Sequence, residues 1–360
     1  MKIFNFSLDQ NLLNQESAVS QRLVSLGQIT ERYLIMVPTR FDRSLDLSDK
    51  VSVLGVGGKI KIQILIRIFI QAYKILKQDH YDLITVQDTY FLALVAWILE
   101  RRFKLPLEIQ VHGFERFRLI RKILARFLLA RATGVRVVSQ RLKEQLITEF
   151  KIPAEKISTI SVVNDFKCDE MAPLIPREES EFIFLTVARL VKVKNIEAEL
   201  RVLAKLKLDY PQVRLWLVGD GPERQNLDQT VADLGLQNMV KFWGQRSDLA
   251  SFYRSADTLV LFSKSEGWGL VVLEAGLCGL PVIMSDVGCA DEVVKDRRSG
   301  LVVPVGDGLA LEQALRQILT DESLRTRLAQ NLSYELSRLP DRKQSLELQR
   351  QTWSKLILSK

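Results

Sequence analysis

The segment that most constrains the fold of this 360-residue chain lies between residues 258 and 285. An apolar run is followed by a polar, glycine-rich turn, then by apolar residues spaced as in a helix, and finally by a second apolar run. This succession predicts a strand, a turn, a helix and another strand, which is the repeating unit of parallel sheets. Gly267 and Gly269 let backbone N–H groups approach a ligand, and the helix start adds free donors. The segment therefore suits a bound phosphate group.

Two carboxylates bracket this turn. Glu266 precedes it, and Glu274 follows with seven residues between the two. Because an α-helix has about 3.6 residues per turn, Glu274 lies about two turns along the helix and on nearly the same face. From there its carboxylate can reach a pair of sugar hydroxyls.

Strand-like and helix-like segments alternate along the chain, which predicts α/β domains whose parallel sheets are covered by helices on both faces. The expected strands span residues 2–7, 33–37, 83–87, 107–111, 134–138 and 157–162, and then 182–188, 214–218, 239–242, 258–262, 281–284 and 301–303. The expected helices include 90–102, 114–131 and 140–150. The run 59–76 has isoleucines at alternate positions, as in a strand, but its length favours a helix.

The length predicts two domains. We expect an N-terminal domain at 1–165, a proline-containing linker at 166–180 and a C-terminal domain at 181–340. A last helix is expected within 341–360. It either crosses back to the N-terminal domain or packs on its own domain.

Four shorter motifs accompany the central segment. They are Ala188-Arg-Leu with Lys194-Asn195, Val218-Gly-Asp-Gly-Pro222, Phe242-Trp-Gly244, and Gly300-Leu-Val-Val-Pro with Gly306-Asp307. Together with Glu266-Gly-Trp-Gly-Leu, Glu274-Ala and Gly279-Leu-Pro281-Val, they resemble the donor-site signature of the family-4 retaining glycosyltransferases, or glycosyl transferases group 1. The resemblance covers residues 180–310 closely and residues 1–165 more loosely. It implies the GT-B fold, in which two Rossmann-like, doubly wound parallel-sheet domains face each other across a cleft.

The resemblance also implies roles for individual residues. Arg189 and Lys194 would hold the two phosphates of a nucleotide-sugar donor, and Glu266 would contact hydroxyls of the donor sugar. Glu274 would accept hydrogen bonds from the ribose. Further donor contacts are expected from Gly219, Gly267, Trp268, Gly269 and Leu270. Because two cations and several amide donors can replace a metal ion at a diphosphate, neither a metal nor a cofactor is expected.

Three features of the N-terminal half bear on the site. His112 ends an expected strand, and the resemblance places a His-Gly pair here, facing the donor sugar. Asp88, beside Gln87, ends another strand and is a candidate for binding the acceptor. Many family members carry two glycines in the first loop, but residues 9–18 contain none, so contacts of that loop cannot be carried over.

These features predict a retaining, metal-independent glycosyltransferase that moves a sugar from a UDP- or GDP-sugar to an acceptor hydroxyl. The expected acceptor is a lipid-linked or cell-surface glycan. Two alternatives stay open, namely a nucleotide-sugar epimerase of the same fold and a non-catalytic nucleotide-sugar binding module. An epimerase needs further acid–base groups in the N-terminal half, where His112 and Asp88 are the candidates. A binding module would not need all four charged residues of the expected donor site, which are Arg189, Lys194, Glu266 and Glu274.

The positive charge is concentrated in the N-terminal half. Residues 1–170 hold 26 Lys and Arg against 18 Asp and Glu, and residues 101–143 alone hold 12 against 2. The helix expected at 114–131 is basic and amphipathic, which is typical of a membrane-surface element and equally of an ordinary domain helix. We expect 101–143 to contact anionic lipid rather than nucleic acid, because no stacking aromatics or recognition motif accompany the charge.

The cysteines and the hydropathy of the chain bear on the cellular location of the protein. Cys168, Cys278 and Cys289 lack metal-ligand spacing and cannot all pair, so we expect reduced thiols. No apolar run reaches the length of a membrane span. The sequence therefore predicts a cytoplasmic protein, attached peripherally to the inner face of the cell membrane if the lipid interpretation holds.

Overall fold

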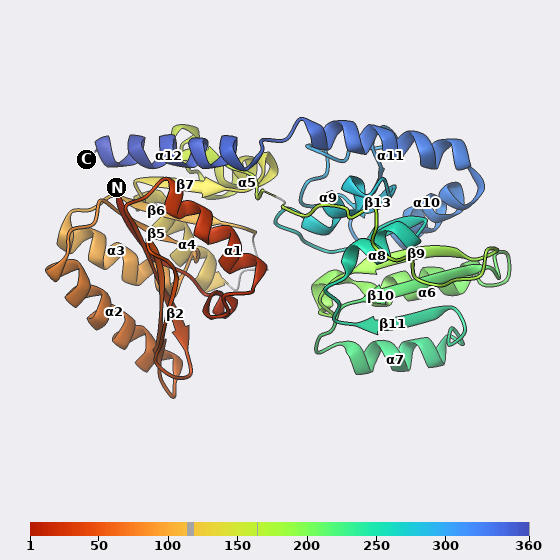
Figure 1. The fold of residues 1–360 in the computed structure, drawn as a ribbon, viewed down its shortest axis with the longest axis horizontal. Coiled ribbons are helices and arrows are strands. Elements are labelled where there is room, and N and C mark those ends of the chain that lie inside the picture. Colours follow the sequence, from red (N-terminus) through yellow and green to blue (C-terminus); the bar gives the residue numbers. More distant parts are fainter. Residues whose placement is uncertain (114–118, 164, 360) are drawn as a thin grey trace. The chain divides into compact units, whose positions relative to one another are not determined.

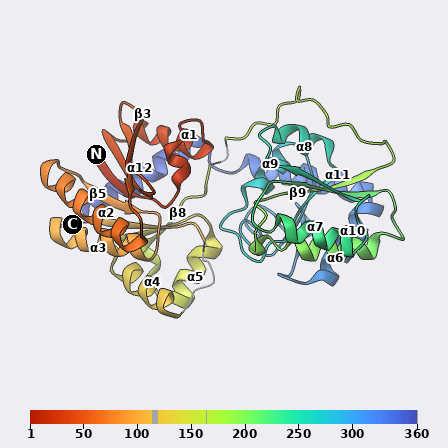
Figure 2. The ribbon, with the colours of Figure 1, turned by 90° about the horizontal axis from the view of Figure 1, so that it is seen from below.

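The chain folds into two units, each with its own sheet. A computed structural model describes residues 1–113, 119–163 and 165–359. Unit 1 comprises Met1–Ser161 together with Pro340–Lys360, and unit 2 comprises Val162–Leu339. Figures 1 and 2 show helices on both faces of each sheet.

Unit 1 contains an eight-stranded sheet in the order β3-β4-β2-β1-β5-β6-β7-β8. Its strands are β1 (Lys2–Phe6), β2 (Arg32–Thr39), β3 (Arg43–Ser48), β4 (Val51–Gly57), β5 (Leu83–Val86), β6 (Leu107–Val111), β7 (Gly134–Val137) and β8 (Ile157–Thr159). Neighbouring strands are parallel except β3, which runs antiparallel to β4 at the edge. The β3–β4 hairpin was not among the expected strands.

Helices cover both faces of this sheet. They are α1 (Ala18–Val24), α2 (Lys61–Gln78), α3 (Phe91–Phe103), α4 (Leu119–Arg131), α5 (Gln140–Phe150) and α12 (Arg342–Leu358), with the 3₁₀ turns η1 (Gln10–Leu13), η2 (Ser25–Gln28) and η3 (Ala154–Lys156). The ambiguous isoleucine-rich run forms α2, which buries Ile68, Ala72 and Leu76 at four-residue intervals. The first residues of the helix expected at 114–131, residues 114–118, lie outside the described residues.

The last helix, α12, packs in unit 1. Trp353 is 1% exposed, and its ring stacks on Tyr33 of β2 with 5.9 Å between the centroids. The indole Nε1 donates to Glu108 at 3.1 Å, and Arg136 of β7 donates to Gln349 at 2.5 Å. Trp353 thus belongs to the core formed by β1, β2, β4 and β5.

Unit 2 contains a six-stranded, fully parallel sheet in the order β11-β10-β9-β12-β13-β14. Its strands are β9 (Phe182–Val187), β10 (Val213–Val218), β11 (Val240–Gly244), β12 (Thr258–Leu261), β13 (Val282–Ser285) and β14 (Leu301–Val303). Its helices are α6 (Ile196–Leu206), α7 (Arg224–Asp233), α8 (Leu249–Ser255), α9 (Leu270–Leu277), α10 (Gly308–Thr320) and α11 (Glu322–Ser337), with the turn η4 (Lys192–Lys194). Counted along the unit, the strand order is 3-2-1-4-5-6, that of a Rossmann domain.

One expectation about the cysteines is wrong. Cys168 and Cys278 form a disulfide that joins the segment before β9 to the end of α9, while Cys289 is buried outside this pair. Reduced thiols were one reason to expect a cytoplasmic location, and that reason no longer holds. Among the described residues, no helix is long and apolar enough to cross a membrane.

Candidate functional site

The candidate site of unit 2 lies where the direction of the strand order reverses. The chain continues from β9 to one side of the sheet and from β12 to the other, and ligands of such sheets bind beyond the carboxyl ends of the strands at this point. The loop after β9 carries Arg189 and Lys194, and the loop after β12 carries Glu266. The two loops are joined because Lys264 N donates to Val193 O at 2.7 Å.

A carboxylate and a cation from these two loops form an ion pair. Lys194 Nζ lies 2.5 Å from Glu266 Oε1, with 21% of the lysine side chain and 11% of the glutamate side chain exposed. The hydroxyl of Ser263, which is fully buried, donates to the same oxygen at 2.6 Å. The pair is therefore held in place before any ligand binds.

A second carboxyl group lies beneath this loop. Glu199 of α6 is buried, accepts from Phe262 N at 3.2 Å and meets the hydroxyl of Thr186 at 2.8 Å. Burial raises its pKa to about 8, although both hydrogen bonds act in the opposite direction. When protonated, Glu199 can donate to Thr186 Oγ1, which in turn donates to Val260 O at 3.3 Å. Glu199 thereby fixes the backbone immediately before Ser263.

The glycine-rich turn leads directly into α9. Gly269 has a φ of 90°, a conformation that favours glycine, and Leu270 is the first helical residue. Gly267 is half-buried. Trp268 is 5% exposed, and its Nε1 has no hydrogen-bond partner among the described residues. Because a buried donor without an acceptor is costly, this N–H and the amides at the start of α9 are suited to ligand oxygens.

Glu274 is positioned by a tyrosine of the preceding helix. The hydroxyl of Tyr253, in α8, donates to Glu274 Oε2 at 2.7 Å. Burial and the negative charge of Glu274 raise the pKa of Tyr253, so the phenol stays a donor. The hydrogen bond favours one orientation of the carboxylate.

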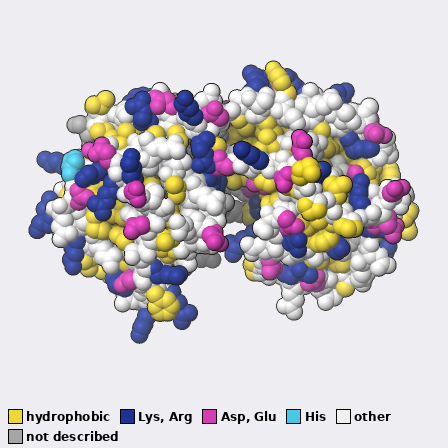
Figure 3. Space-filling model, viewed as in Figure 1, with side chains coloured by type: hydrophobic (Ala, Val, Ile, Leu, Met, Phe, Trp, Pro, Cys, Tyr) yellow, Lys and Arg dark blue, Asp and Glu magenta, His cyan; other side chains and the backbone are white. Residues whose placement is uncertain are grey.

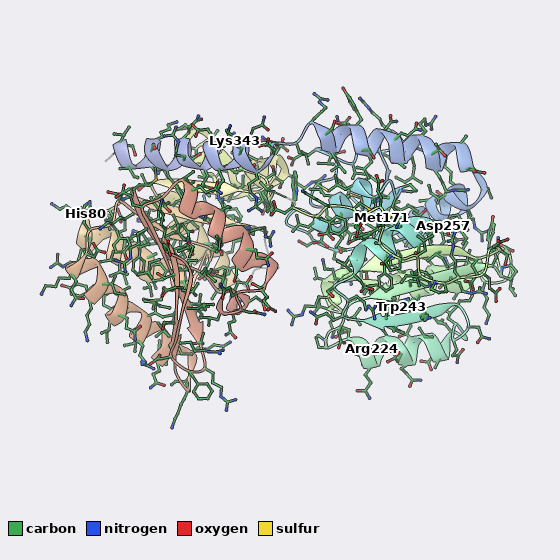
Figure 4. All side chains as sticks on the ribbon, viewed as in Figure 1. His80, Met171, Arg224, Trp243, Asp257 and Lys343 are labelled. Carbon is green, nitrogen blue, oxygen red and sulfur yellow. A yellow bond between two sulfur atoms is a disulfide. The ribbon has the colours of Figure 1, made fainter. Side chains whose placement is uncertain are left out.

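The segment expected to be a linker, 166–180, runs along α8 and α9 of unit 2. Its contacts are the edge of the Phe166 ring on Tyr253, the Cys168–Cys278 disulfide, Ile175 N on Ser255 Oγ, and an ion pair of Arg177 with Asp257. Figure 4 labels Met171 and Asp257 on this side of unit 2. The segment thus packs against the two helices that carry Tyr253 and Glu274.

Gly219 has a structural reason to be glycine. Its φ is 128°, and a Cβ at this position would lie 2.0 Å from Ala188 O. Gly219 N also donates to Gly244 O at 2.7 Å. The close approach of the loops after β9 and β10 requires glycine here, and contact with a donor stays a prediction.

The candidate residues of unit 1 lie at the carboxyl ends of β5 and β6. The His112 side chain is exposed directly after β6. Asp88 is buried and accepts from Leu92 N at 2.8 Å, which caps the start of α3; burial raises its pKa. Ser7 after β1 donates to Gln87 at 2.8 Å. The roles expected of His112 toward the donor and of Asp88 toward the acceptor stay predictions.

Three residues of the candidate site were not predicted from the sequence, namely Ser263, Tyr253 and Glu199. Ser263 directly follows the β12 run, and a small hydroxyl residue three positions before Glu266 could have been noticed. Tyr253 lies 21 residues before its partner Glu274, and Glu199 lies 67 residues before Glu266, whose loop it supports. No spacing rule connects either pair.

Comparison with known proteins identifies the family. Residues 170–333 match the family model "Glycosyl transferases group 1", and residues 39–162 match "Glycosyltransferase Family 4". The chain is 36% identical to the lipopolysaccharide core biosynthesis glycosyltransferase LpsE of Rhizobium meliloti over 148 residues, which are 41% of this chain and 42% of that protein. It is 35% identical over 146 residues to the N-acetyl-alpha-D-glucosaminyl L-malate synthase of Bacillus anthracis, which are 41% and 38% of the two chains. The chain thus spans less than half the length of these relatives.

Solved structures share the whole fold. The sucrose-phosphate synthase of Thermosynechococcus elongatus superposes with a TM-score of 0.84 at 21% identity and covers 100% of both chains. Anabaena HepE, solved in complex with UDP, superposes with a TM-score of 0.76 at 22% identity and covers 99% of this chain and 100% of its own. The chain belongs to the group 1, family 4 glycosyltransferases and has their GT-B fold. The family and the fold class predicted from the sequence are therefore confirmed.

Proposed function

We propose that the chain is a retaining, metal-independent glycosyltransferase that moves a sugar from a UDP- or GDP-sugar to an acceptor hydroxyl. The observation that carries this proposal is the Lys194–Glu266 ion pair at the switch point of unit 2, with its oxygen shared by Ser263. It combines a cation for phosphate with a carboxylate for sugar hydroxyls in one preformed unit.

The donor diphosphate is assigned to the cationic side of this site. Lys194 has three N–H donors, so it can keep its bond to Glu266 while it binds a phosphate oxygen. Arg189 supplies a second, permanently charged group, and the first amides of α9 supply neutral donors. Their attraction grows as negative charge develops on the leaving phosphate, which lowers the barrier of the reaction. This charge balance supports transfer without a metal ion.

The proposed step is a displacement on the front face of the sugar. The bond between the anomeric carbon and the phosphate oxygen breaks, and a bond from the acceptor oxygen to the same carbon forms on the same face. The leaving phosphate oxygen takes the acceptor's proton, so no enzymic base is required. Glu266 orients the sugar, and Glu274, held by Tyr253, orients the ribose.

The acceptor is proposed to be a lipid-linked or cell-surface glycan, reached from an anionic membrane surface through residues 101–143. Within the described part of this region, α4 exposes Ile123 and Phe127 beside the exposed cations Arg121, Lys122 and Arg126. Leu128, on the other side of the helix, is fully buried. The core thus takes some of the apolar side chains of α4, such as Leu128, whereas Ile123 and Phe127 remain exposed for contact with lipid.

A donor panel tests the proposal. Acceptor-dependent release of UDP or GDP is expected, whereas release of an epimer without acceptor would identify an epimerase, and binding without turnover would identify a binding module. NMR of the product from an α-linked donor should show an α-linkage, since a β-linkage would exclude retention. Activity should persist after treatment with EDTA, and its loss, with rescue by a divalent cation, would contradict metal independence.

Glu266→Gln should lower kcat by about a hundredfold or more and change the Kd for the nucleotide little, because this carboxylate is assigned to the donor sugar and not to the nucleotide. Glu197→Gln is the matched control, since Glu197 lies on the exposed face of α6. Wild-type turnover by Glu266→Gln would contradict the donor-site assignment.

A further inference from the structure

One end of unit 1 exposes apolar side chains that the transfer reaction does not use. The turn after β2 exposes 68% of Phe41, and the start of α2 exposes 59% of Ile60, 60% of Ile62 and 53% of Ile66. Apolar side chains gathered on one surface mark interaction sites, whereas single ones are ordinary. Figure 3 shows hydrophobic surface enclosed by Lys and Arg at this end of unit 1.

Hydrogen bonds join the two segments into one surface. Asp42 accepts from Gly57 N at 2.7 Å and from Arg67 Nη2 at 2.7 Å, and Arg67 Nη1 donates to Gly57 O at 2.5 Å. A Cβ at Gly57 would lie 2.6 Å from the backbone of Phe41, so the turn rests directly on the end of β4. We call the resulting surface the basic tip, and it consists of Arg40, Phe41, Arg43, Lys59, Ile60, Lys61, Ile62 and Ile66.

Hydrogen bonds hold the backbone of the basic tip although it is exposed. Thr39 Oγ1 donates to Phe41 O at 2.7 Å, which closes the turn. Gln63 accepts from Lys59 N at 3.0 Å, which fixes the entry to α2. Because the apolar side chains are presented on an ordered backbone, binding does not have to order this backbone first.

The charge of the basic tip points to an anionic partner. Arg40, Arg43, Lys59 and Lys61 are exposed, and none of the four forms an ion pair with a described residue. The carboxylate of Asp42 is already engaged by Gly57 N–H and Arg67, which lower its pKa. A second copy of the chain would bring four like charges against four, which disfavours a symmetric dimer through this surface.

We propose that the basic tip docks unit 1 onto an anionic lipid surface. Phe41 and the three isoleucines enter the boundary between headgroups and acyl chains, and the four cations bind the headgroups around them. The inference adds a second element to the membrane contact proposed for α4 and does not depend on the transfer reaction.

Flotation of the full-length chain with vesicles tests the proposal. Vesicles of phosphatidylglycerol and phosphatidylcholine should bind the protein at low salt and release it at high salt, and pure phosphatidylcholine should bind it weakly. The triple variant Phe41→Ser, Ile60→Ser, Ile62→Ser should bind at least tenfold more weakly. The double variant Arg40→Gln, Lys61→Gln should bind roughly thirtyfold more weakly, since each cation near an anionic surface contributes independently.

Matched variants elsewhere serve as controls. Leu208→Ser with Leu309→Ser removes two apolar side chains of unit 2 that are 90% and 61% exposed. Arg327→Gln with Lys343→Gln removes two exposed cations, of which Figure 4 labels Lys343 on α12. Both pairs should bind like the wild type.

A fluorescent probe locates the inserted residue. Phe41→Trp should be quenched by lipids with brominated acyl chains, whereas Leu208→Trp should not, after subtraction of the native tryptophans. Wild-type binding by the triple variant, equal binding to neutral vesicles, or an unquenched Phe41→Trp would each overturn the proposal. Loss of binding in Arg121→Glu, Lys122→Glu while the tip variants still bind would assign the contact to α4 alone and would also overturn it. The assay contains no nucleotide sugar, so failure of the proposed transfer activity is detected separately.

Discussion

Among single residues, Tyr253 donates a hydrogen bond that helps to orient Glu274. Tyr253→Phe keeps the buried ring and removes the hydrogen bond to Glu274 Oε2, which is 2.7 Å long in the wild type. A hydrogen bond to a charged group contributes about 1.5–3 kcal/mol, so the Kd for UDP or GDP should rise by about tenfold or more. Calorimetric titration measures this Kd. The control is Tyr334→Phe, at an exposed position of α11. An unchanged Kd would show that Glu274 does not need this donor.

Glu199 predicts a pH dependence of stability. Its pKa in the folded state is about 8, against an ordinary value of 4.5, so the fold favours the protonated form. The stabilising contribution is full below about pH 4.5 and is lost as the pH rises through about 8, a change on the order of a few kcal/mol. Glu199→Gln, which cannot ionise, should therefore gain stability over the wild type as the pH rises from 6 to 9. Urea titrations at several pH values measure this, and parallel curves for the two proteins would refute it.

The residues of the candidate site differ in how far the sequence could predict them. Arg189, Lys194, Glu266 and Glu274 were predicted because they lie in motifs of a known family. The ion pair between Lys194 and Glu266 was not, because it joins two loops across neighbouring strands. Contacts of this kind depend on the strand order, and the sequence does not state the strand order.

At the scale of elements, the disulfide ties residues 166–180 to the end of α9. Cys168 and Cys278 are 110 residues apart, so the bond strongly restricts the unfolded chain. Replacing both with serine should lower the free energy of unfolding by about 2–4 kcal/mol. The double variant should also become insensitive to dithiothreitol, whereas the wild type should lose stability in it. Equal stability of both proteins with and without reductant would show that this bond does not contribute.

Regular elements were predicted better than edge elements. The expected strands of unit 2 match β9 to β14 within one or two residues, because buried parallel strands are continuous apolar runs. The edge strand β3 was missed because it carries polar residues such as Arg43, Ser44 and Asp46. Its neighbour β4, an interior strand, was also missed, and the edge position does not explain that. The pairing of Cys168 with Cys278 could not be predicted either, since cysteine spacing does not define connectivity.

At the scale of the whole molecule, the two units have separate cores, and unit 1 is completed by the end of the chain. The N-terminal strands therefore depend on a residue more than 300 positions away, Trp353, which fills the core between Tyr33 and Glu108. We therefore expect folding of unit 1 to require α12, whereas unit 2 is continuous in sequence from Val162 to Leu339.

Trp353→Ala should destabilise unit 1 selectively. The change leaves a cavity and removes the donor to the buried carboxylate of Glu108, which together should cost about 3–5 kcal/mol. Hydrogen exchange should show lost protection in β1, β2 and β5, with β9 and β12 unchanged. Leu358→Ala on the same helix, where the side chain is 86% exposed, should leave both units unchanged. Equal loss of protection in β9 and β12 would mean that the two units unfold together, and the cores would then not be independent.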